Sequence, residues 1–197
     1  MTVLGALVVA MTVTSGLLML LEPGPSAPRA GVPLQTIDRT GDQPAPQAML
    51  FQTEVPEVRW NSIVIHDSRT PHGSAQTLHH VHQQLGRGGL GNHFVIDNGP
   101  GADDGKVEVG FRWSSQAPGA FFADEAVDWP DAIGICLIGD GQSSRFSDAQ
   151  LHQLVWLVQN LQKRYGIPRS SVYIQIGSRT ADSTFPEVWF RQQLISR

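Results

Sequence analysis

Five of the seven histidines lie close together in the sequence, within residues 66–82. Imidazole side chains bind metal ions and transfer protons near neutral pH, so this cluster is a candidate metal or acid–base site. His79 and His82 are three residues apart on a predicted helix and can face the same way. The interpretation we favour is a polar groove wall together with solvated histidines. The cluster consists of His66, His72, His79, His80 and His82.

A second candidate site is the loop in residues 173–187, which reads YIQIGSRTADSTFPE. Its first residues alternate like a strand and then break at Gly177, and sites in α/β proteins collect where strands end in loops. The loop is polar but contains neither His nor Cys. Asp182 is a candidate for a relocated metal ligand, or for an acid–base pair with Asp67, but no pattern in the sequence sets either distance.

Two further residues have simple interpretations. Cys136 is the only cysteine and lies in the apolar run AIGICLIGD, where we expect a buried, inert thiol. A single cysteine also excludes a disulfide framework and a Cys-rich zinc module. Trp129, in VDWPD, is expected either in the core or at a rim where it could stack on a sugar.

Strands must position these residues. Apolar runs predict buried strands in SIVIHDS (residues 62–68), AIGICLIGD (132–140) and SVYIQIG (171–177). NHFVIDNG and KVEVGFRW predict a strand pair joined by a turn-rich loop.

Helices are predicted between and after these strands. Ser74 is a plausible cap of a short helix that ends near Gly86, and Ser147 caps a long helix that ends at Gly166. Pro186 opens a final helix. The order strand, long helix, strand implies a parallel crossover, so we expect an α/β domain with a central mixed sheet flanked by helices. The apolar stripe of the long helix consists of Leu151, Leu154, Val155, Val158, Leu161 and Tyr165.

The composition limits the function classes. The chain has 197 residues, of which 41% are hydrophobic and 16% charged, which fits one packed domain. The formal net charge is −4 and no basic residues cluster, which argues against nucleic-acid binding.

The amino-terminal part is organised differently from the domain. Residues 1–21 carry no charge and would span roughly 30 Å as a helix, which matches one hydrocarbon core. They lack a basic start and a clear cleavage site, so we favour a membrane anchor over a cleaved signal segment. Residues 22–54 form a Pro-rich linker, and residues 55–197 form the domain. We expect a membrane-anchored protein on the periplasmic or cell-wall side, secreted if the segment is cleaved.

The order of several motifs resembles a known family. IVIHDS, LGNHFVID, AIGICLIGD and GSRTADSTFPE follow one another, with the long helix between the last two. Over about residues 58–195 the chain resembles the zinc-dependent N-acetylmuramoyl-L-alanine amidases, a family that includes the peptidoglycan recognition proteins. The resemblance implies the amidase fold. In active members, two His and one Cys or Asp hold a zinc ion that activates water to cut the amide between the muramyl lactyl group and L-alanine.

The resemblance also implies where the zinc ligands should be. The first ligand position is His66, which is retained. The second, the His of G-H-R-D, is Ser178 here, although Arg179 beside it matches the family. The third ligand position is Phe185, between the recognisable neighbours Thr184 and Pro186. Only one of the three ligand positions therefore keeps a metal-binding side chain, and a structural or catalytic zinc site needs three or four protein ligands.

Other family positions differ as well. Asp67 stands where a second His often follows the first ligand, Asn92 replaces the catalytic Tyr, and Phe121 replaces the His of G-A-H. We expect no catalytic residues and no cofactor, with zinc only if the site is rebuilt. The residues expected to contact a bound ligand are His66, His82, Asn92, His93, Ser178 and Arg179.

These departures predict a peptidoglycan-associated domain of the amidase fold that does not hydrolyse its ligand. Its expected partners are peptidoglycan or muramyl peptides, and the membrane through residues 1–21. Two alternatives stay open: an active amidase with a rearranged zinc site, and a protein-interaction scaffold.

Overall fold

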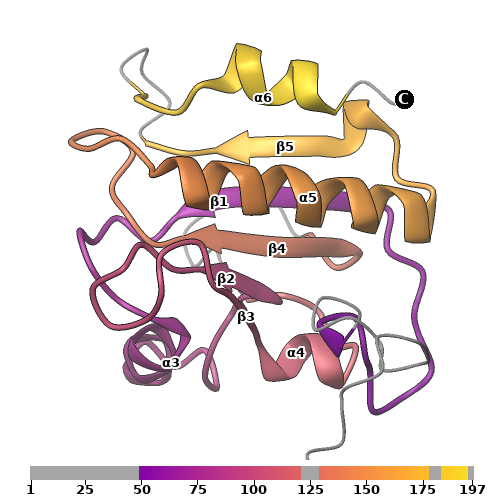
Figure 1. The fold of residues 1–197 in the computed structure, drawn as a ribbon. Coiled ribbons are helices and arrows are strands. Elements are labelled where there is room, and N and C mark those ends of the chain that lie inside the picture. Colours follow the sequence, from indigo (N-terminus) through magenta and orange to yellow (C-terminus); the bar gives the residue numbers. More distant parts are fainter. Residues whose placement is uncertain (1–48, 121–128, 178–182, 195–197) are drawn as a thin grey trace, which may run out of the picture. The chain divides into compact units, whose positions relative to one another are not determined.

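A five-stranded mixed sheet forms the centre of the domain (Figure 1). The computed structural model describes residues 49–120, 129–177 and 183–194. The strand order is β3-β2-β4-β1-β5; β1 is parallel to β4 and β5, and β2 is parallel to β4 but antiparallel to β3. The predicted mixed sheet is therefore confirmed. The strands are β1 (Ser62–Asp67), β2 (Phe94–Ile96), β3 (Val107–Val109), β4 (Ala132–Leu137) and β5 (Val172–Gln175).

Helices flank the sheet, as predicted. In Figure 1 the long helix α5 runs across the front of β1 and β4, and α6 lies above β5. The described helices are α3 (Ala75–Gln84), α4 (Phe111–Ser114), α5 (Asp148–Tyr165) and α6 (Glu187–Gln193), with a 3-10 helix η1 (Arg169–Ser171) before β5.

The ends of α5 follow from its sequence. The Ser147 hydroxyl accepts a hydrogen bond from the Gln150 amide, and the Gln150 side chain accepts one from the Ser147 amide, which together make a capping box. At the other end Gly166 has φ 68°, the left-handed conformation that glycine adopts without strain. Both ends were predicted, and they fix where the chain enters and leaves this helix.

The main core lies between α5 and the sheet. Alternate residues of the strands face α5 because successive side chains of a strand point to opposite faces. Burying each large apolar side chain contributes about 1.5–3 kcal/mol, so this layer supplies much of the stability of the domain. Its buried members include Ile63, Ile65, Ile133, Ile135, Leu137, Leu154, Leu157, Val158 and Leu161.

The opposite face of the sheet carries a smaller core under α3. Leu78 of α3 packs with Val95 and Cys136 of the sheet, and Leu90 and Ile138 complete the cluster. Burial raises the pKa of the Cys136 thiol far above its usual range. The side chain is therefore buried and inert, as expected.

The segment before β1 belongs to the fold. The Phe51 ring lies 6.3 Å from the ring of Phe94, 6.5 Å from Trp113 and 5.7 Å from Trp156. Farther along, Glu57 forms an ion pair with Arg164 of α5. Core contacts thus begin at Phe51, before Val55, where the sequence placed the start of the domain.

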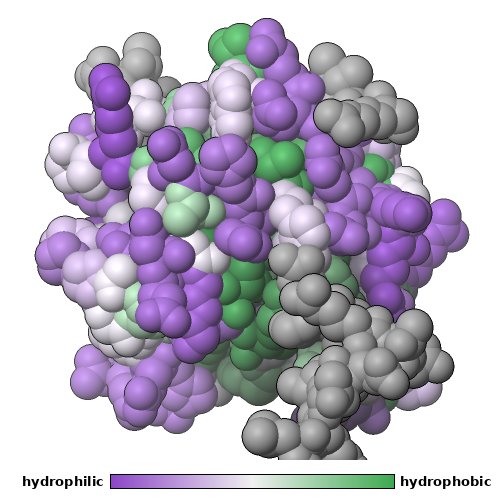
Figure 2. All heavy atoms as spheres, in the orientation of Figure 1, coloured by the Kyte–Doolittle hydropathy of each residue, from purple (hydrophilic) through white to green (hydrophobic). Residues whose placement is uncertain are grey.

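In the same orientation as Figure 1, hydrophilic residues cover most of the visible face, with hydrophobic residues showing between them (Figure 2). None of the helices within residues 49–120, 129–177 and 183–194 has the length and apolar character needed to cross a membrane. The anchor predicted in residues 1–21 and nearly all of the predicted linker lie outside these ranges.

Candidate functional site

His66 lies at the carboxyl end of the central strand β1, between Cys136 of β4 and Gln175 of β5. Parallel strands end at the same edge of a sheet, and loops at that edge are where α/β proteins place their sites. The His66 side chain is 8% exposed, so burial lowers the pKa of His66 to about 4. The imidazole is therefore neutral at pH 7.

Hydrogen bonds to Asp67 and Asn92 orient the His66 ring. Its Nδ1 atom lies 3.1 Å from the main-chain oxygen of Asp67, which can only accept, so Nδ1 carries the proton. Nε2 then offers its lone pair, and the side-chain amide nitrogen of Asn92 donates to it at 2.5 Å. The lone pair that could bind a metal is engaged in a hydrogen bond.

Asn92 is fully buried, and one of its two polar atoms is satisfied. The amide nitrogen bonds to His66, whereas Oδ1 has no hydrogen-bond partner among the described residues. A buried acceptor without a donor is rare in proteins and marks a place with a functional or structural demand. The resemblance implies the catalytic Tyr position for Asn92 and the first ligand position for His66, and the structure joins these two side chains directly.

His79 and His82 of α3 shape the loop that leads to Asn92. The Nδ1 atom of His82 accepts from the amide of Gly91 at 2.9 Å, and that of His79 accepts from Leu90 at 3.2 Å. Burial lowers the pKa of His82 to about 4, which keeps its ring neutral and able to accept. These two histidines therefore position the main chain, and their Nδ1 atoms are not open to a metal.

His93 belongs to the core and not to an exposed surface. It has no exposed area, its Nε2 atom donates to Ala117 at 3.0 Å, and its Nδ1 atom accepts from Gly134 at 2.9 Å. Its ring also packs edge-on against Trp60, 4.8 Å between centroids. Sequence reasoning placed His93 among the ligand contacts, and the structure differs, because both ring nitrogens already serve the main chain.

Asp67 holds a neighbouring loop in place. Its Oδ2 atom accepts from the amide of Gly141 at 2.8 Å. Gly141 has no room for a side chain, since a Cβ atom there would lie 2.2 Å from Ile176. Thr184 binds the same loop through the carbonyl oxygens of Gly141 and Ser144. Asp67 and Thr184 thus fix one loop from two sides. The acid–base pair proposed for Asp67 with Asp182 is not tested, because Asp182 lies outside the described residues.

Phe185, for which the resemblance implies the third ligand position, packs into the main core. It is 7% exposed, and its ring lies 6.1 Å from that of Phe146 and 5.5 Å from that of Phe190. The Phe185 side chain therefore packs with the α5 layer of the domain. The other residues singled out in this loop, Ser178, Arg179 and Asp182, lie outside the described residues, as does Phe121.

Trp129, which the sequence analysis singled out, forms an aromatic pair with Tyr173, which it did not. Trp129 is partly buried against Val64 and Ala132, and its ring lies 4.6 Å from that of Tyr173. Tyr173 pairs with Val64, and Gln175 pairs with His66, so alternation along β5 puts Tyr173 on the same face of the sheet as His66. The sequence analysis singled out Trp129 but not Tyr173. The signal that could have identified Tyr173 is its spacing of two residues from Gln175, which puts both side chains on one face of the strand.

The described residues do not fit a zinc ion at His66. Within residues 49–120, 129–177 and 183–194, no three His, Cys, Asp or Glu side chains gather as a metal site would require. The Nε2 atom of His66 bonds to Asn92, and Phe185 offers no ligand atom. The described part of the site can bind through hydrogen bonds, but it holds no set of metal ligands.

Comparisons with known proteins agree with this fold. The sequence model of the N-acetylmuramoyl-L-alanine amidase family matches residues 56–184, more than half of the chain. Among curated proteins, no sequence matches.

Several solved structures are similar. The N-acetylmuramoyl-L-alanine amidase LysC from Clostridium intestinale shares 22% identity, with 75% of this chain and 95% of that chain covered and a TM-score of 0.57. The endolysin LysCS from the same organism shares 21%, covering 75% and 93%, with a TM-score of 0.55. Drosophila PGRP-LB shares 19%, covering 70% and 85%, with a TM-score of 0.50. The structural likeness shows a common fold, and the sequence match over residues 56–184 places this chain in the N-acetylmuramoyl-L-alanine amidase family.

Proposed function

We propose that this protein binds peptidoglycan or its muramyl peptides without hydrolysing them. The observation that carries the proposal is the hydrogen bond from the Asn92 amide to Nε2 of His66. The chain belongs to a family whose members are named for cutting the amide between muramic acid and L-alanine. Family membership supports the ligand class, and the bonding of His66 supports the lack of turnover.

The physical argument against hydrolysis concerns the metal ligands. A catalytic zinc ion needs three protein ligands and one open position for water. At the second and third ligand positions this chain has Ser178 and Phe185. A serine hydroxyl would have to ionise to bind zinc well, and the phenylalanine ring packs with Phe146 and Phe190. Zinc at His66 would also have to displace Asn92.

Binding can persist where catalysis has gone. Losing a metal removes stabilisation of the transition state, whereas contacts to the ground state from the walls of the site remain. Arg179, which follows β5 and keeps its family position, is the candidate partner for a stem-peptide carboxylate, because guanidinium groups bind carboxylates in a bidentate manner. The Oδ1 atom of Asn92 is a candidate acceptor for a peptide amide.

Three measurements on the full-length protein in mild detergent test the proposal. Metal analysis after dialysis should find well under one zinc per chain. Incubation with a muramyl pentapeptide should give no cleaved product by mass spectrometry, and calorimetric titration should show binding. A full equivalent of zinc that survives dialysis and is lost in His66→Ala would instead establish the amidase with a rearranged site. Absence of binding at millimolar ligand would favour the protein-interaction scaffold.

We also propose that residues 1–21 anchor the protein in a membrane, with the domain on the side facing away from the cytoplasm. The support is their uncharged, apolar sequence, followed by a Pro-rich linker that would hold the domain away from the membrane. Carbonate extraction of membranes, combined with mass analysis of the amino terminus, tests this. A soluble protein with a new amino terminus beyond residue 21 would identify a cleaved signal segment.

A further inference from the structure

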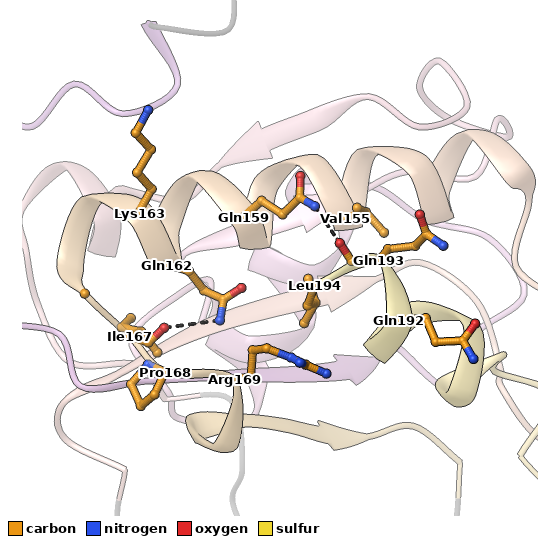
Figure 3. Close-up of a pocket in the computed structure, with 11 residues that line it drawn as sticks. Val155, Gln159, Gln162, Lys163, Ile167, Pro168, Arg169, Gln192, Gln193 and Leu194 are labelled. Carbon is orange, nitrogen blue, oxygen red and sulfur yellow. Dashed lines mark hydrogen bonds between the residues drawn. The ribbon is translucent and has the colours of Figure 1, made fainter. Parts of the chain in front are cut away.

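A pocket lies between the last turns of α5 and the end of α6, with a volume of about 930 Å³ (Figure 3). Ligand pockets typically have about 300–1,000 Å³, so it is large enough for a small molecule or a short peptide. The pocket adjoins η1, directly before β5, whereas His66 pairs with Gln175 at the other end of β5. The pocket is therefore separate from the His66 site.

The wall of the pocket is rich in amide side chains. Gln159 and Gln162 reach from α5 and donate to the main-chain oxygens of Gln193 at 2.7 Å and Ile167 at 3.1 Å (Figure 3). Their side-chain oxygens stay available as acceptors. The side chain of Gln193 is exposed and makes no hydrogen bond with a described residue. Amide groups that both donate and accept match the alternating donors and acceptors of a peptide main chain.

Arg169 brings one positive charge to this wall. One guanidinium nitrogen, Nη2, donates to the main-chain oxygen of Arg191 at 3.1 Å. No carboxylate of a described residue lies within ion-pair distance of Arg169, and none of the described lining residues is acidic. Lys163 also borders the pocket, but its ammonium group points away from the other lining residues (Figure 3). The guanidinium group is thus a cation with bonding capacity left for an anion.

The floor of the pocket is aliphatic. Ile167 and Leu194 are buried there, at 4% and 3% exposure, and Val155 lies partly buried beside them. None of the described residues that line the pocket is aromatic, so they offer no ring on which a sugar could stack. Small aliphatic side chains of a peptide fit this floor better than a glycan does.

We propose that this pocket is a second binding site, which takes the carboxylate end of a short peptide with small aliphatic side chains. Arg169 binds the carboxylate, the glutamine side chains bind the peptide main chain, and Ile167 and Leu194 contact the aliphatic side chains. The site is independent of ligand binding near His66, because the two lie at opposite ends of β5.

The test compares two probes that differ only in charge at the carboxyl end. N-acetyl-L-alanyl-L-alanine and its carboxyl-terminal amide are each titrated into the ¹⁵N-labelled full-length protein in mild detergent and followed by NMR. The acid should shift the amide signals of Gln162, Ile167 and Leu194, and the amide probe should bind at least about tenfold more weakly. Equal binding of both probes, or shifts confined to His66 and Asn92, would overturn the proposal.

Two variants and a control assign the contact. Arg169→Gln should raise the dissociation constant of the acid probe about tenfold or more. Gln193→Glu removes no observed side-chain bond, and it should also weaken binding because it places a negative charge beside the carboxylate of the probe. If Arg169→Gln does not fold, this second variant tests the site. Arg145→Gln changes an exposed arginine just before α5, at the other end of that helix, and should leave binding unchanged. Unchanged affinity in both folded pocket variants would refute the site.

Discussion

The side-chain amide of Asn92 donates a hydrogen bond to Nε2 of His66 at 2.5 Å, and both residues are buried. The bond joins the loop before β2 to the end of β1 across the intervening strand β4. Because the proton of His66 is on Nδ1, Nε2 can accept the Asn92 bond while the imidazole ring is neutral. This contact is a buried polar link between two segments that are far apart in the sequence.

Removing this contact should destabilise the protein. We expect Asn92→Ala to lower the free energy of unfolding by about 1–3 kcal/mol, because Nε2 of His66 would lose its donor in a buried place. Urea denaturation followed by circular dichroism measures the change. Asn61→Ala, which removes only a 3.5 Å bond from an exposed asparagine to Asp131, serves as the control and should change stability by less than about 0.5 kcal/mol. A neutral Asn92→Ala would mean that the contact contributes nothing to folding.

Phe185 should behave as a core residue. We expect Phe185→Ala to cost about 3–5 kcal/mol of stability, the usual range for deleting a buried aromatic ring. Val188→Ala, in the next helix and 74% exposed, is the matched control and should be nearly neutral. Thermal unfolding of the three proteins checks this expectation. An effect of Phe185→Ala as small as that of the control would contradict the packing against Phe146 and Phe190.

Asp97 should make stability depend on pH. The residue is fully buried, and burial, together with the charge of Glu108, raises the pKa of Asp97 to about 7. Neither carboxyl oxygen of Asp97 meets a donor among the described residues. The folded state thus favours the neutral acid. The contribution of neutral Asp97 to the free energy of unfolding is fully present below its unfolded pKa near 3.8. This contribution is lost as the pH rises through about 7, the pKa in the folded state.

The variant Asp97→Asn isolates this effect, since it cannot ionise. Relative to the parent, it should gain about 2–4 kcal/mol of stability between pH 4 and pH 8. Urea denaturation across this range measures the difference for both proteins. Asp103→Asn changes an exposed carboxylate of the same loop and should show no such trend. A constant difference between Asp97→Asn and the parent would place the Asp97 carboxyl in a solvated environment instead.

Arg179 should anchor a muramyl peptide. We expect Arg179→Ala to weaken binding of a muramyl pentapeptide by about 1.5–3 kcal/mol, the range for hydrogen bonds to charged groups. Calorimetric titration gives the affinity, and Arg145→Ala provides an exposed arginine as control. If both variants bind as the parent does, peptide binding stands but Arg179 takes no part in it.

The sequence predicted the framework because its signals are local. Apolar runs marked β1, β4 and β5, and Ser147 and Gly166 marked both ends of α5, since capping depends on the residues next to the helix end. Phe51 escaped notice because a single aromatic residue beside a Pro-rich stretch has no period to reveal it. Its place in the core depends on rings more than 40 positions away.

The site was harder to predict than the framework. The resemblance to the amidase family marked His93 as a ligand contact, but in the folded protein both of its ring nitrogens bond to the main chain. The bond between His66 and Asn92 joins residues 26 positions apart, which no local pattern encodes. The resemblance singled out Phe185, but its packing against Phe146 and Phe190 depends on tertiary contacts that no local pattern encodes.

The way the chain enters the domain has a mechanical consequence. A pull on the chain before Phe51 first loads the packing of Phe51 on Trp113 and Trp156, and then the ion pair of Glu57 with Arg164. Next it reaches β1, which is hydrogen-bonded along both edges, to β4 and to β5. A force along β1 must shear both ladders at once and cannot unzip them bond by bond. The central strand is thus the part of the domain that resists a pull on the chain before Phe51 most strongly.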